Sequence, residues 1–203
     1  KDEVEIYFSF LHSLSQTRDK EELFKILKSN LILMLYNMVE ACMRSSIEYI
    51  YIDMELKQVS FDYLTDKLKN RIINDLKNIN EIDINAVQKV NSIAAGIAKL
   101  SFKKEKLFGG NIDAKKIKNL SENYGFTCNT NAKESKNGEC LRTIKDKRND
   151  LAHGVESFSE VGKEYTIQDL ERMKNECIAY LSGILDNIEE YLNNQKYLSA
   201  PPL

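Results

Sequence analysis

Apolar residues recur every three or four positions along most of the chain, which is the spacing of one face of an α-helix. The longest such stripe extends from Leu23 to Leu56. Its members are Leu23, Leu27, Leu31, Met34, Met38, Cys42, Ser45, Tyr49, Ile52 and Leu56. A single long helix with one buried face is therefore predicted, and Asp19 with Glu22 three positions later can cap its start.

A second stripe of the same period lies near the end of the chain. Its members are Leu170, Met173, Cys177, Leu181, Ile184, Ile188 and Leu192. Thr166 and Asp169 stand in front of it at the spacing of a capping pair. A second long helix is therefore predicted, and the two long helices can bury their apolar faces against each other.

Shorter helices are predicted around these two from capping residues and turn signals. The expected ranges are 4–13, 61–76 after Ser60, 85–97 after Asn85, a helix that ends at Tyr124 and starts at Asn111 or Asp113, and 138–153. Gly109-Gly110-Asn111 is typical of a turn, and residues 128–137 are expected to form a polar connector.

The composition favours an all-α fold. Proline occurs only at Pro201 and Pro202, only eight of the 203 residues are glycine, and 42% of the residues are hydrophobic. Little therefore interrupts long helices, and the chain can bury a core. We expect one domain over residues 1–203, an all-α bundle with two long core helices and extra short helices. Residues 1–18 are expected to hold the N-terminal helix, and residues 199–203 a flexible tail.

The charge balance is slightly acidic, with a formal net charge of −2. Nucleic acid would therefore have to bind a local basic patch rather than respond to a positive field around the whole protein. Residues 99–106 and 142–148 are the two basic runs. Runs of this kind are most often solvated helix faces, so alone they do not establish nucleic-acid binding.

The four cysteines are Cys42, Cys128, Cys140 and Cys177, and they lie far apart in the sequence. No CxxC spacing or adjacent histidine suggests a zinc site or a redox pair, so we expect free thiols, no metal site and no cofactor.

The apolar run at residues 31–43 is interrupted by Asn37 and Glu40 and is too short to span a bilayer. The first residues do not have the pattern of a signal peptide. We expect a soluble cytoplasmic protein that does not bind membranes.

Candidate chemistry lies in the segment Arg148-Asn149-Asp150-Leu151-Ala152-His153-Gly154. An arginine can neutralise a phosphodiester through two parallel hydrogen bonds, and an imidazole can move protons near neutral pH. This pair suits RNA cleavage in which a 2′-hydroxyl attacks the phosphate. An R-x4-H spacing alone is weak evidence, because it arises by chance in many helices.

Helical spacing predicts where these side chains lie. Arg148 continues the apolar stripe of Leu141, Ile144 and Leu151, so it should face inward and need an anionic partner or ligand. Lys145, Asn149 and His153 share another face at i, i+4 and i+8, so Asn149 is expected to hydrogen-bond the imidazole. His153 should lie at the end of its helix, where Gly154 can adopt a left-handed conformation.

A second polar group lies inside the most apolar part of the chain. Asn37, Glu40 and Arg44 share one helix face at i, i+3 and i+7. Glu40 either holds Arg44 within the helix or orients Arg148 across the bundle, and both alternatives stay open. His12, the only other histidine, is expected to pack or to lie on the surface.

At these residues the chain resembles the HEPN superfamily (higher eukaryotes and prokaryotes nucleotide-binding domains), and within it the MAE-like nuclease branch. Several short matches occur in the same order as in the family. They are Tyr36-Asn37-Met38-Val39-Glu40, Gly110-Asn111-Ile112-Asp113, Tyr124-Gly125, Ile144-Lys145 leading into residues 148–154, Ser157-Phe158 with Gly162, Tyr191-Leu192 and Tyr197-Leu198.

The resemblance implies a helical bundle that forms a homodimer and brings two R-x4-6-H motifs into one cleft. It makes Arg148 and His153 the catalytic pair of a metal-independent endoribonuclease. Asn149 is the polar residue that follows the arginine, and Lys145, Asn37 and Glu40 are supporting candidates. RNA would be the substrate, and an antitoxin or regulatory protein a partner, because many relatives act as toxins or in phage defence. The alternatives are a non-catalytic HEPN module that binds nucleotide, RNA or protein, and a helical adaptor.

Overall fold

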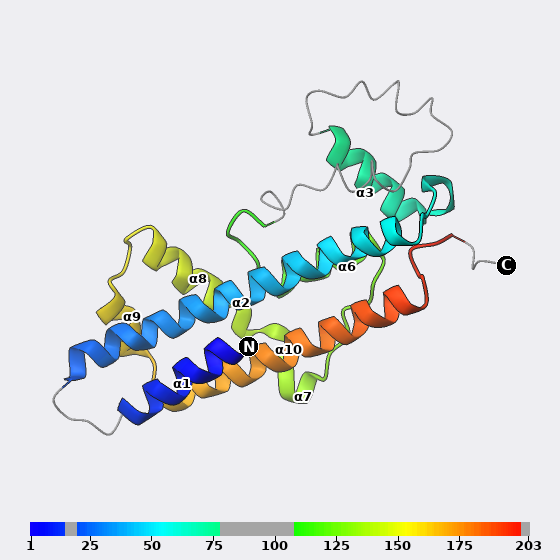
Figure 1. Ribbon diagram of the computed structural model, residues 1–203. Coiled ribbons are helices and arrows are strands. Elements are labelled where there is room, and N and C mark those ends of the chain that lie inside the picture. The colour runs from blue at the N-terminus through cyan, green and yellow to red at the C-terminus, as the bar shows by residue number, and fades with distance from the viewer. Residues whose placement is uncertain (15–19, 78–107, 200–203) are drawn as a thin grey trace. The chain divides into compact units, whose positions relative to one another are not determined.

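The computed structural model describes residues 1–14, 20–77 and 108–199, and Figure 1 shows the helices that they form. These helices are α1 (Asp2–Leu14), α2 (Glu21–Leu56), α3 (Asp66–Lys77), α6 (Ala114–Tyr124), α7 (Ala132–Ser135), α8 (Cys140–Ala152), α9 (Phe158–Glu164) and α10 (Ile167–Asn193). Within the described ranges no strand occurs, and one isolated β-bridge joins Leu64 to Leu198. The prediction of an all-α fold with two long core helices and extra short helices is confirmed.

The chain forms two compact units. The first unit comprises residues 1–42, 110–114 and 130–183, and the second comprises residues 43–109, 115–129 and 184–203. Both α2 and α10 contribute one part to each unit. The expectation of a single domain over residues 1–203 stays a prediction.

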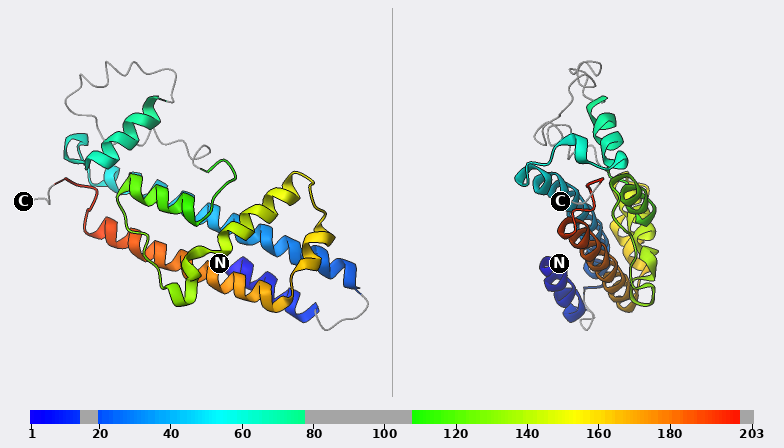
Figure 2. Two further views of the ribbon diagram at one scale, coloured as in Figure 1. Left: turned by 180° about the vertical axis from the view of Figure 1, so that it is seen from behind. Right: turned by 90° about the vertical axis from the view of Figure 1, so that its right-hand side faces the viewer.

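The core of the first unit is apolar and combines five helices. Figures 1 and 2 show α1 lying along the N-terminal part of α10. The buried side chains include Val4, Phe8 and Leu11 from α1, Leu31 and Leu35 from α2, Leu141 and Ile144 from α8, Val161 from α9, and Leu170 and Cys177 from α10. The buried Lys174 forms an ion pair with Glu5, which attaches α1 to α10.

Helix α9 packs directly on the backbone of α2. A Cβ atom at Gly162 would overlap the carbonyl oxygen of Lys25 and lie 2.6 Å from its carbonyl carbon. Ser157 and Glu160 form a reciprocal capping box at the start of α9. The Ser29 hydroxyl donates to the Phe158 carbonyl, so the first turn of α9 is also attached to α2.

The second unit is held by tyrosines whose hydroxyls form hydrogen bonds. The Tyr51 and Tyr124 hydroxyls lie 3.3 Å apart, and the Tyr191 hydroxyl donates to the Tyr124 carbonyl at 2.6 Å. The Tyr197 hydroxyl donates to Asp53 at 2.8 Å. Buried tyrosine therefore supplies both apolar area and polar contacts in this unit.

The stripe predicted for the last helix is confirmed, and the one predicted for α2 is partly wrong. Every member of the α10 stripe is buried, and Thr166 with Asp169 caps its start reciprocally. In the α2 stripe, Leu23, Ser45, Tyr49 and Leu56 are exposed, and Leu31 is the one of its ten members that is buried. The buried positions of α2 include Leu31, Leu35, Val39, Met43, Ile47, Ile50 and Met54. Residues 31–36 are apolar on almost every side of the helix, so several stripes share one period and periodicity does not select among them.

Three short segments differ from the predictions, and one of them is α9 at Phe158–Glu164, a helix that was not predicted. The Ser60 side chain makes no capping hydrogen bond, and a 3-10 turn at Phe61–Tyr63 precedes α3. The expected polar connector at residues 128–137 contains α7, which Asn131 caps, and a second 3-10 turn follows at Lys136–Gly138. The backbone is left-handed at Asn137 (φ 53°) and Gly138 (φ 75°), so the motif helix begins later than predicted, at Cys140.

Other predictions concern parts of the chain that are not described. The helix expected over residues 85–97, the basic run at residues 99–106, the cap at Asp19 and most of the expected tail lie outside the described residues.

Helix α2 is longer than the apolar run on which the argument against a membrane span was based. Among the described helices, α2 alone is long and apolar enough to cross a membrane by length and composition. The core helix of a globular protein can meet the same criterion, and Leu31, Leu35 and Met43 of α2 are completely buried within the protein.

Candidate functional site

Helix α8 contains Arg148 and Asn149 and ends at Ala152, with His153 as its C-cap. Leu141, Ile144 and Leu151 are buried, as predicted for the inward face. Two hydrogen bonds close the helix, from Gly154 N to the Leu151 carbonyl at 3.3 Å and from Val155 N to the Asp150 carbonyl at 2.8 Å. This is a Schellman motif, and Gly154 takes the left-handed conformation that it requires (φ 67°). The predicted role of Gly154 is confirmed.

Arg148 is half-buried and lies on the ring of Tyr36. Its Cζ is 4.7 Å from the centroid of that ring, a cation–π distance. Nη1 donates to the Gly110 carbonyl at 3.2 Å and to Asn149 Oδ1 at 2.9 Å. Within the described ranges no carboxylate pairs with Arg148, and Nε and Nη2 have no acceptor. An arginine has five N–H donors, so donors on one edge of the guanidinium remain available for an anion.

Asn149 supports Arg148 and not the imidazole, so the predicted Asn149 to His153 side-chain contact is wrong. An arginine only donates hydrogen bonds, so the amide oxygen of Asn149 must face it. The amide nitrogen then donates to Asn111 Oδ1 at 3.0 Å. His153 meets Asn149 only through the backbone, where His153 N donates to the Asn149 carbonyl. The physical reason is that His153 is the C-cap and has left the helical path (φ −96°, ψ 0°).

Lys145 is neutralised by carboxylates. Its Nζ lies 2.7 Å from Asp113 and 3.4 Å from Asp146. The hydrogen bond that Lys145 donates to Asp113 is the main reason that the pKa of Lys145 is raised. Lys145 therefore attaches the segment around Asp113 to α8, and its charge is already paired.

Lys147 is paired in the same way. Its Nζ lies 2.7 Å from Glu156 and 2.8 Å from Glu164, so it joins α8 to α9 and to the loop between them. Burial lowers the pKa of Lys147, but the hydrogen bonds to the two carboxylates outweigh burial and the pKa is raised. With Arg142 beside Asp146 at 3.8 Å, Arg148 is the one cation of the 142–148 run that has no described carboxylate partner.

These pairs predict a dependence of stability on pH. The hydrogen bond from Lys147 holds the pKa of Glu156 below its ordinary 4.5. The unfolded chain therefore binds this proton more readily, so the pair stabilises the fold above pH 4.5 and loses this effect as the pH falls through the folded pKa. Glu156→Gln should lower the free energy of unfolding at neutral pH, and the difference from wild type should shrink in acid. Urea unfolding at several pH values measures it. Glu134→Gln, at an exposed glutamate on α7, is the control, and a pH-independent difference for Glu156→Gln would contradict the prediction.

Tyr36 connects Glu40 to the arginine. Tyr36 is buried, and its hydroxyl accepts from Ile112 N at 3.4 Å and forms a hydrogen bond with Glu40. Burial first, and then the contact with Glu40, raises the pKa of Tyr36 to about 12. The phenol is therefore protonated at neutral pH. Glu40 is thereby linked toward Arg148 through Tyr36, and the alternative in which Glu40 holds Arg44 stays open. Asn37, one residue later, is exposed.

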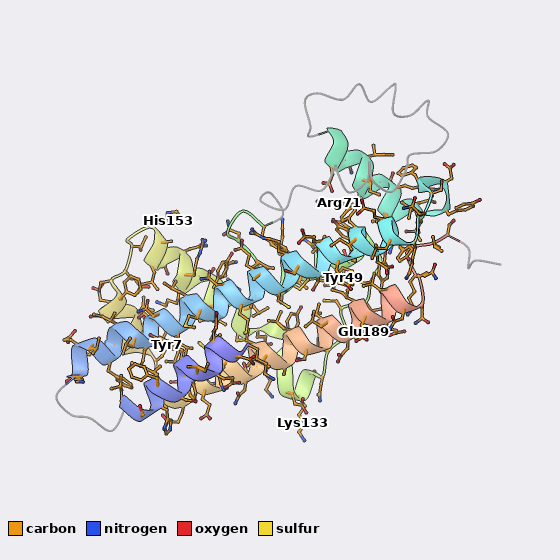
Figure 3. The ribbon with its side chains drawn as sticks, viewed as in Figure 1. Tyr7, Tyr49, Arg71, Lys133, His153 and Glu189 are labelled. Carbon is orange, nitrogen blue, oxygen red and sulfur yellow. The ribbon has the colours of Figure 1, made fainter. Side chains whose placement is uncertain are left out.

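His153 lies at the outer end of α8, and Figure 3 shows its side chain directed away from the neighbouring helices. The residue is exposed, and its imidazole forms no hydrogen bond within the described part of the chain. No contact between described residues brings it to Arg148, so the structure does not unite the predicted catalytic pair within one chain. His12 is exposed on α1, as expected, 6.4 Å from Phe8 between ring centroids.

Four further residues contact Arg148 or the neighbouring side chains Asn149 and Lys145, and they were not among the predicted site residues. They are Tyr36, Gly110, Asn111 and Asp113. All four lie inside short segments that match the HEPN pattern, which was the available signal. Their roles depend on contacts across 32 or more positions of sequence, which periodicity does not reveal.

The described residues contain no group of three or more His, Cys, Asp or Glu side chains that could hold a metal ion. None of the four cysteines forms a disulfide.

Comparison with known families identifies a match over nearly the whole chain. The model of the MAE_28990-like HEPN family matches residues 1–197, which is nearly the whole chain. No curated protein and no solved structure matches. The chain therefore belongs to the MAE_28990-like HEPN family.

Proposed function

We propose that this protein is an endoribonuclease that cleaves RNA by attack of a 2′-hydroxyl on the neighbouring phosphate. The observation that carries the proposal is Arg148, a half-buried cation that no described carboxylate neutralises and whose Nε and Nη2 have no described acceptor. A phosphodiester can accept two parallel hydrogen bonds from such an edge. HEPN domains are frequently nucleases, which agrees with this chemistry.

The reaction requires two proton transfers. A base removes the proton of the 2′-hydroxyl, the 2′-oxygen bonds to phosphorus, and the 5′-oxygen leaves and takes up a proton from an acid. Arg148 would stabilise the negative charge on the phosphorane. The products are a 2′,3′-cyclic phosphate and a 5′-hydroxyl. Arg148 would stabilise the charge and His153 would transfer the protons, so the proposed reaction uses no metal.

One chain supplies one suitable imidazole, so the proposed active site combines two copies. His153 is exposed at the helix end, beside Val155, an apolar residue that is 71% exposed. A symmetric homodimer that covers this end would bring two Arg148 and two His153 side chains into one cleft. His153 would carry out the proton transfers. The other candidate residues would hold the structure of the cleft in place, and they are Lys145, Asn149, Glu40 and Asn37.

The cellular role is part of the proposal. We infer that the protein is a cytoplasmic toxin or defence effector that an antitoxin or regulatory partner restrains. The support is its membership of the HEPN family, together with the toxicity that an unrestrained endoribonuclease would have.

The test is incubation of the purified chain with total RNA in EDTA, followed by analysis of the product ends. We expect cleavage that leaves 2′,3′-cyclic phosphates and 5′-hydroxyls. Ends with a 5′-phosphate would contradict the proposed chemistry. A folded dimer that cleaves no RNA would instead favour a non-catalytic module.

That second candidate, an HEPN module that only binds nucleotide, RNA or a protein, is favoured by one observation. Lys145 and Lys147 are both neutralised by carboxylates, which leaves the 142–148 run with little free positive charge for tight RNA binding.

The side chain at position 149 gives a specific prediction. Asn149→Asp should lower kcat more than Asn149→Ala, because a carboxylate beside Arg148 would pair with the guanidinium and compete with the phosphate. The loss should be about 10²-fold for the aspartate and about tenfold for the alanine. Steady-state cleavage of a short RNA measures both. Equal losses would mean that the neutral amide is not needed to keep Arg148 available.

A further inference from the structure

The segment Gly110-Asn111-Ile112-Asp113 is attached to the site at each of its four residues. The Gly110 carbonyl accepts from Arg148, and Asn111 accepts from Asn149. Ile112 N donates to the Tyr36 hydroxyl, and Asp113 accepts from Lys145. Four consecutive residues therefore bind four different side chains of α2 and α8. A loop that only connects two helices could be held by a single such contact, whereas here each of the four residues makes one.

Gly110 approaches the guanidinium closely. A Cβ atom built there would lie 2.8 Å from Nη1, 3.1 Å from Nη2 and 3.3 Å from Cζ of Arg148. At Gly109, the preceding residue, a Cβ would have no atom of the described residues within 4 Å. Both glycines have a left-handed backbone, with φ of 74° and 54°. The absence of a side chain at position 110 therefore leaves room for Arg148, and Gly109 provides a matched comparison.

Tyr36 supplies the other contact surface. Its ring lies 4.7 Å from Arg148 Cζ, and its buried hydroxyl joins the segment at Ile112. The raised pKa of Tyr36 means that the phenol does not act as a base at neutral pH. Its contribution is contact with the arginine and with the segment.

We propose that Tyr36 and the segment 110–113 form a clamp that fixes the plane of the Arg148 guanidinium, with the Nε and Nη2 donors presented to the phosphate. Tyr36 and Gly110 are positioning residues that act through Arg148. A flexible arginine must lose side-chain freedom when it binds a phosphate, and a clamped one has lost that freedom in advance. The consequence for RNA cleavage rests on the proposed function, but the orientation of the side chain can be measured without it.

The experiment observes the Nε–H group of Arg148 by NMR in the full chain labelled with ¹⁵N-arginine. Arg148→Lys assigns the resonance by its loss. In wild type we expect one resonance displaced by the Tyr36 ring, and titration with inorganic phosphate should shift it. Tyr36→Phe keeps the ring and should keep the displacement, whereas Tyr36→Leu and Gly110→Ala should lose it. Gly109→Ala carries similar backbone strain and should keep it.

Kinetics on a short RNA then separate positioning from general damage. Tyr36→Leu and Gly110→Ala should lower kcat by about 10²-fold with KM changed less than about threefold, and Tyr36→Phe should restore most of kcat. Urea unfolding identifies any variant that is merely unfolded, and Gly110→Ala and Tyr36→Phe test the clamp if Tyr36→Leu does not fold.

An Arg148 resonance that is unchanged in Gly110→Ala, or lost equally in Tyr36→Phe, would overturn the clamp. A resonance that behaves as expected in a protein that cleaves no RNA would support the clamp and contradict the proposed nuclease function.

Discussion

Arg148→Ala and His153→Ala are each expected to lower kcat for RNA cleavage by about 10³-fold or more. The first substitution removes the cation that would stabilise the phosphorane, and the second removes the group that moves protons. Initial rates on a short labelled RNA, with dimer formation checked by light scattering, measure the loss. The two substitutions combined should cost little more than either alone, because groups that act in one step are not additive.

Two variants serve as matched controls. Arg142→Ala removes an exposed arginine of the same helix, and His12→Ala removes the other histidine, which lies on α1. Both should keep wild-type activity. Cleavage that persists in Arg148→Ala and His153→Ala would point to a contaminating nuclease and contradict the assignment.

Gly162→Ala is expected to lower the free energy of unfolding by about 3 kcal/mol or more, because the new methyl group overlaps the α2 backbone at Lys25. In a protein of 203 residues, this loss of stability corresponds to a melting temperature lower by roughly 6–12 °C. The loss should also reduce RNA cleavage, since α9 holds the end of α8 through Lys147 and Glu164. Thermal and urea unfolding measure the effect.

Gly183→Ala is the matched control, since Gly183 also lies within a helix. Its new Cβ would lie 3.0 Å from Cγ2, 3.2 Å from Cβ and 3.4 Å from Cα of Thr130, so it would make tight contacts but no overlap with a backbone carbonyl. We expect a change within about 1 kcal/mol, because alanine itself favours a helix over glycine. A Gly162→Ala protein as stable as Gly183→Ala would mean that α9 does not pack on α2 as closely as the structure has it.

Periodicity predicted the longer helices, because each of them carries its own signal, whereas the short helices α7 and α9 do not. The α10 stripe, its Thr166 and Asp169 cap, and the left-handed Gly154 all depend on residues within a few positions of one another. The α2 stripe was wrong in phase where the sequence is apolar on nearly every side. The choice of buried face there depends on which helices pack against α2, and the sequence of α2 does not contain that information.

The site was predicted less completely, since its contacts are distant in sequence. The R-x4-H spacing makes Arg148 and His153 the candidate pair, and the predicted inward face of α8 agrees with the half-buried position of Arg148. The basic run at residues 142–148 was a candidate patch for nucleic acid. The carboxylates that neutralise its lysines lie on other segments, at Asp113, Glu156 and Glu164, so the run alone did not reveal them. Asn149 was assigned to the imidazole by ideal helix geometry, which no longer applies where the helix ends.

If two copies of the chain share one active site, a dimer with one intact and one altered motif should reveal it. Wild-type and His153→Ala chains with different tags are co-expressed, and the dimer that carries both tags is purified. If the cleft needs both imidazoles, this dimer should cleave RNA at less than about a tenth of the wild-type rate. A rate of about half the wild-type value would mean that each chain has its own complete site, and would contradict the account.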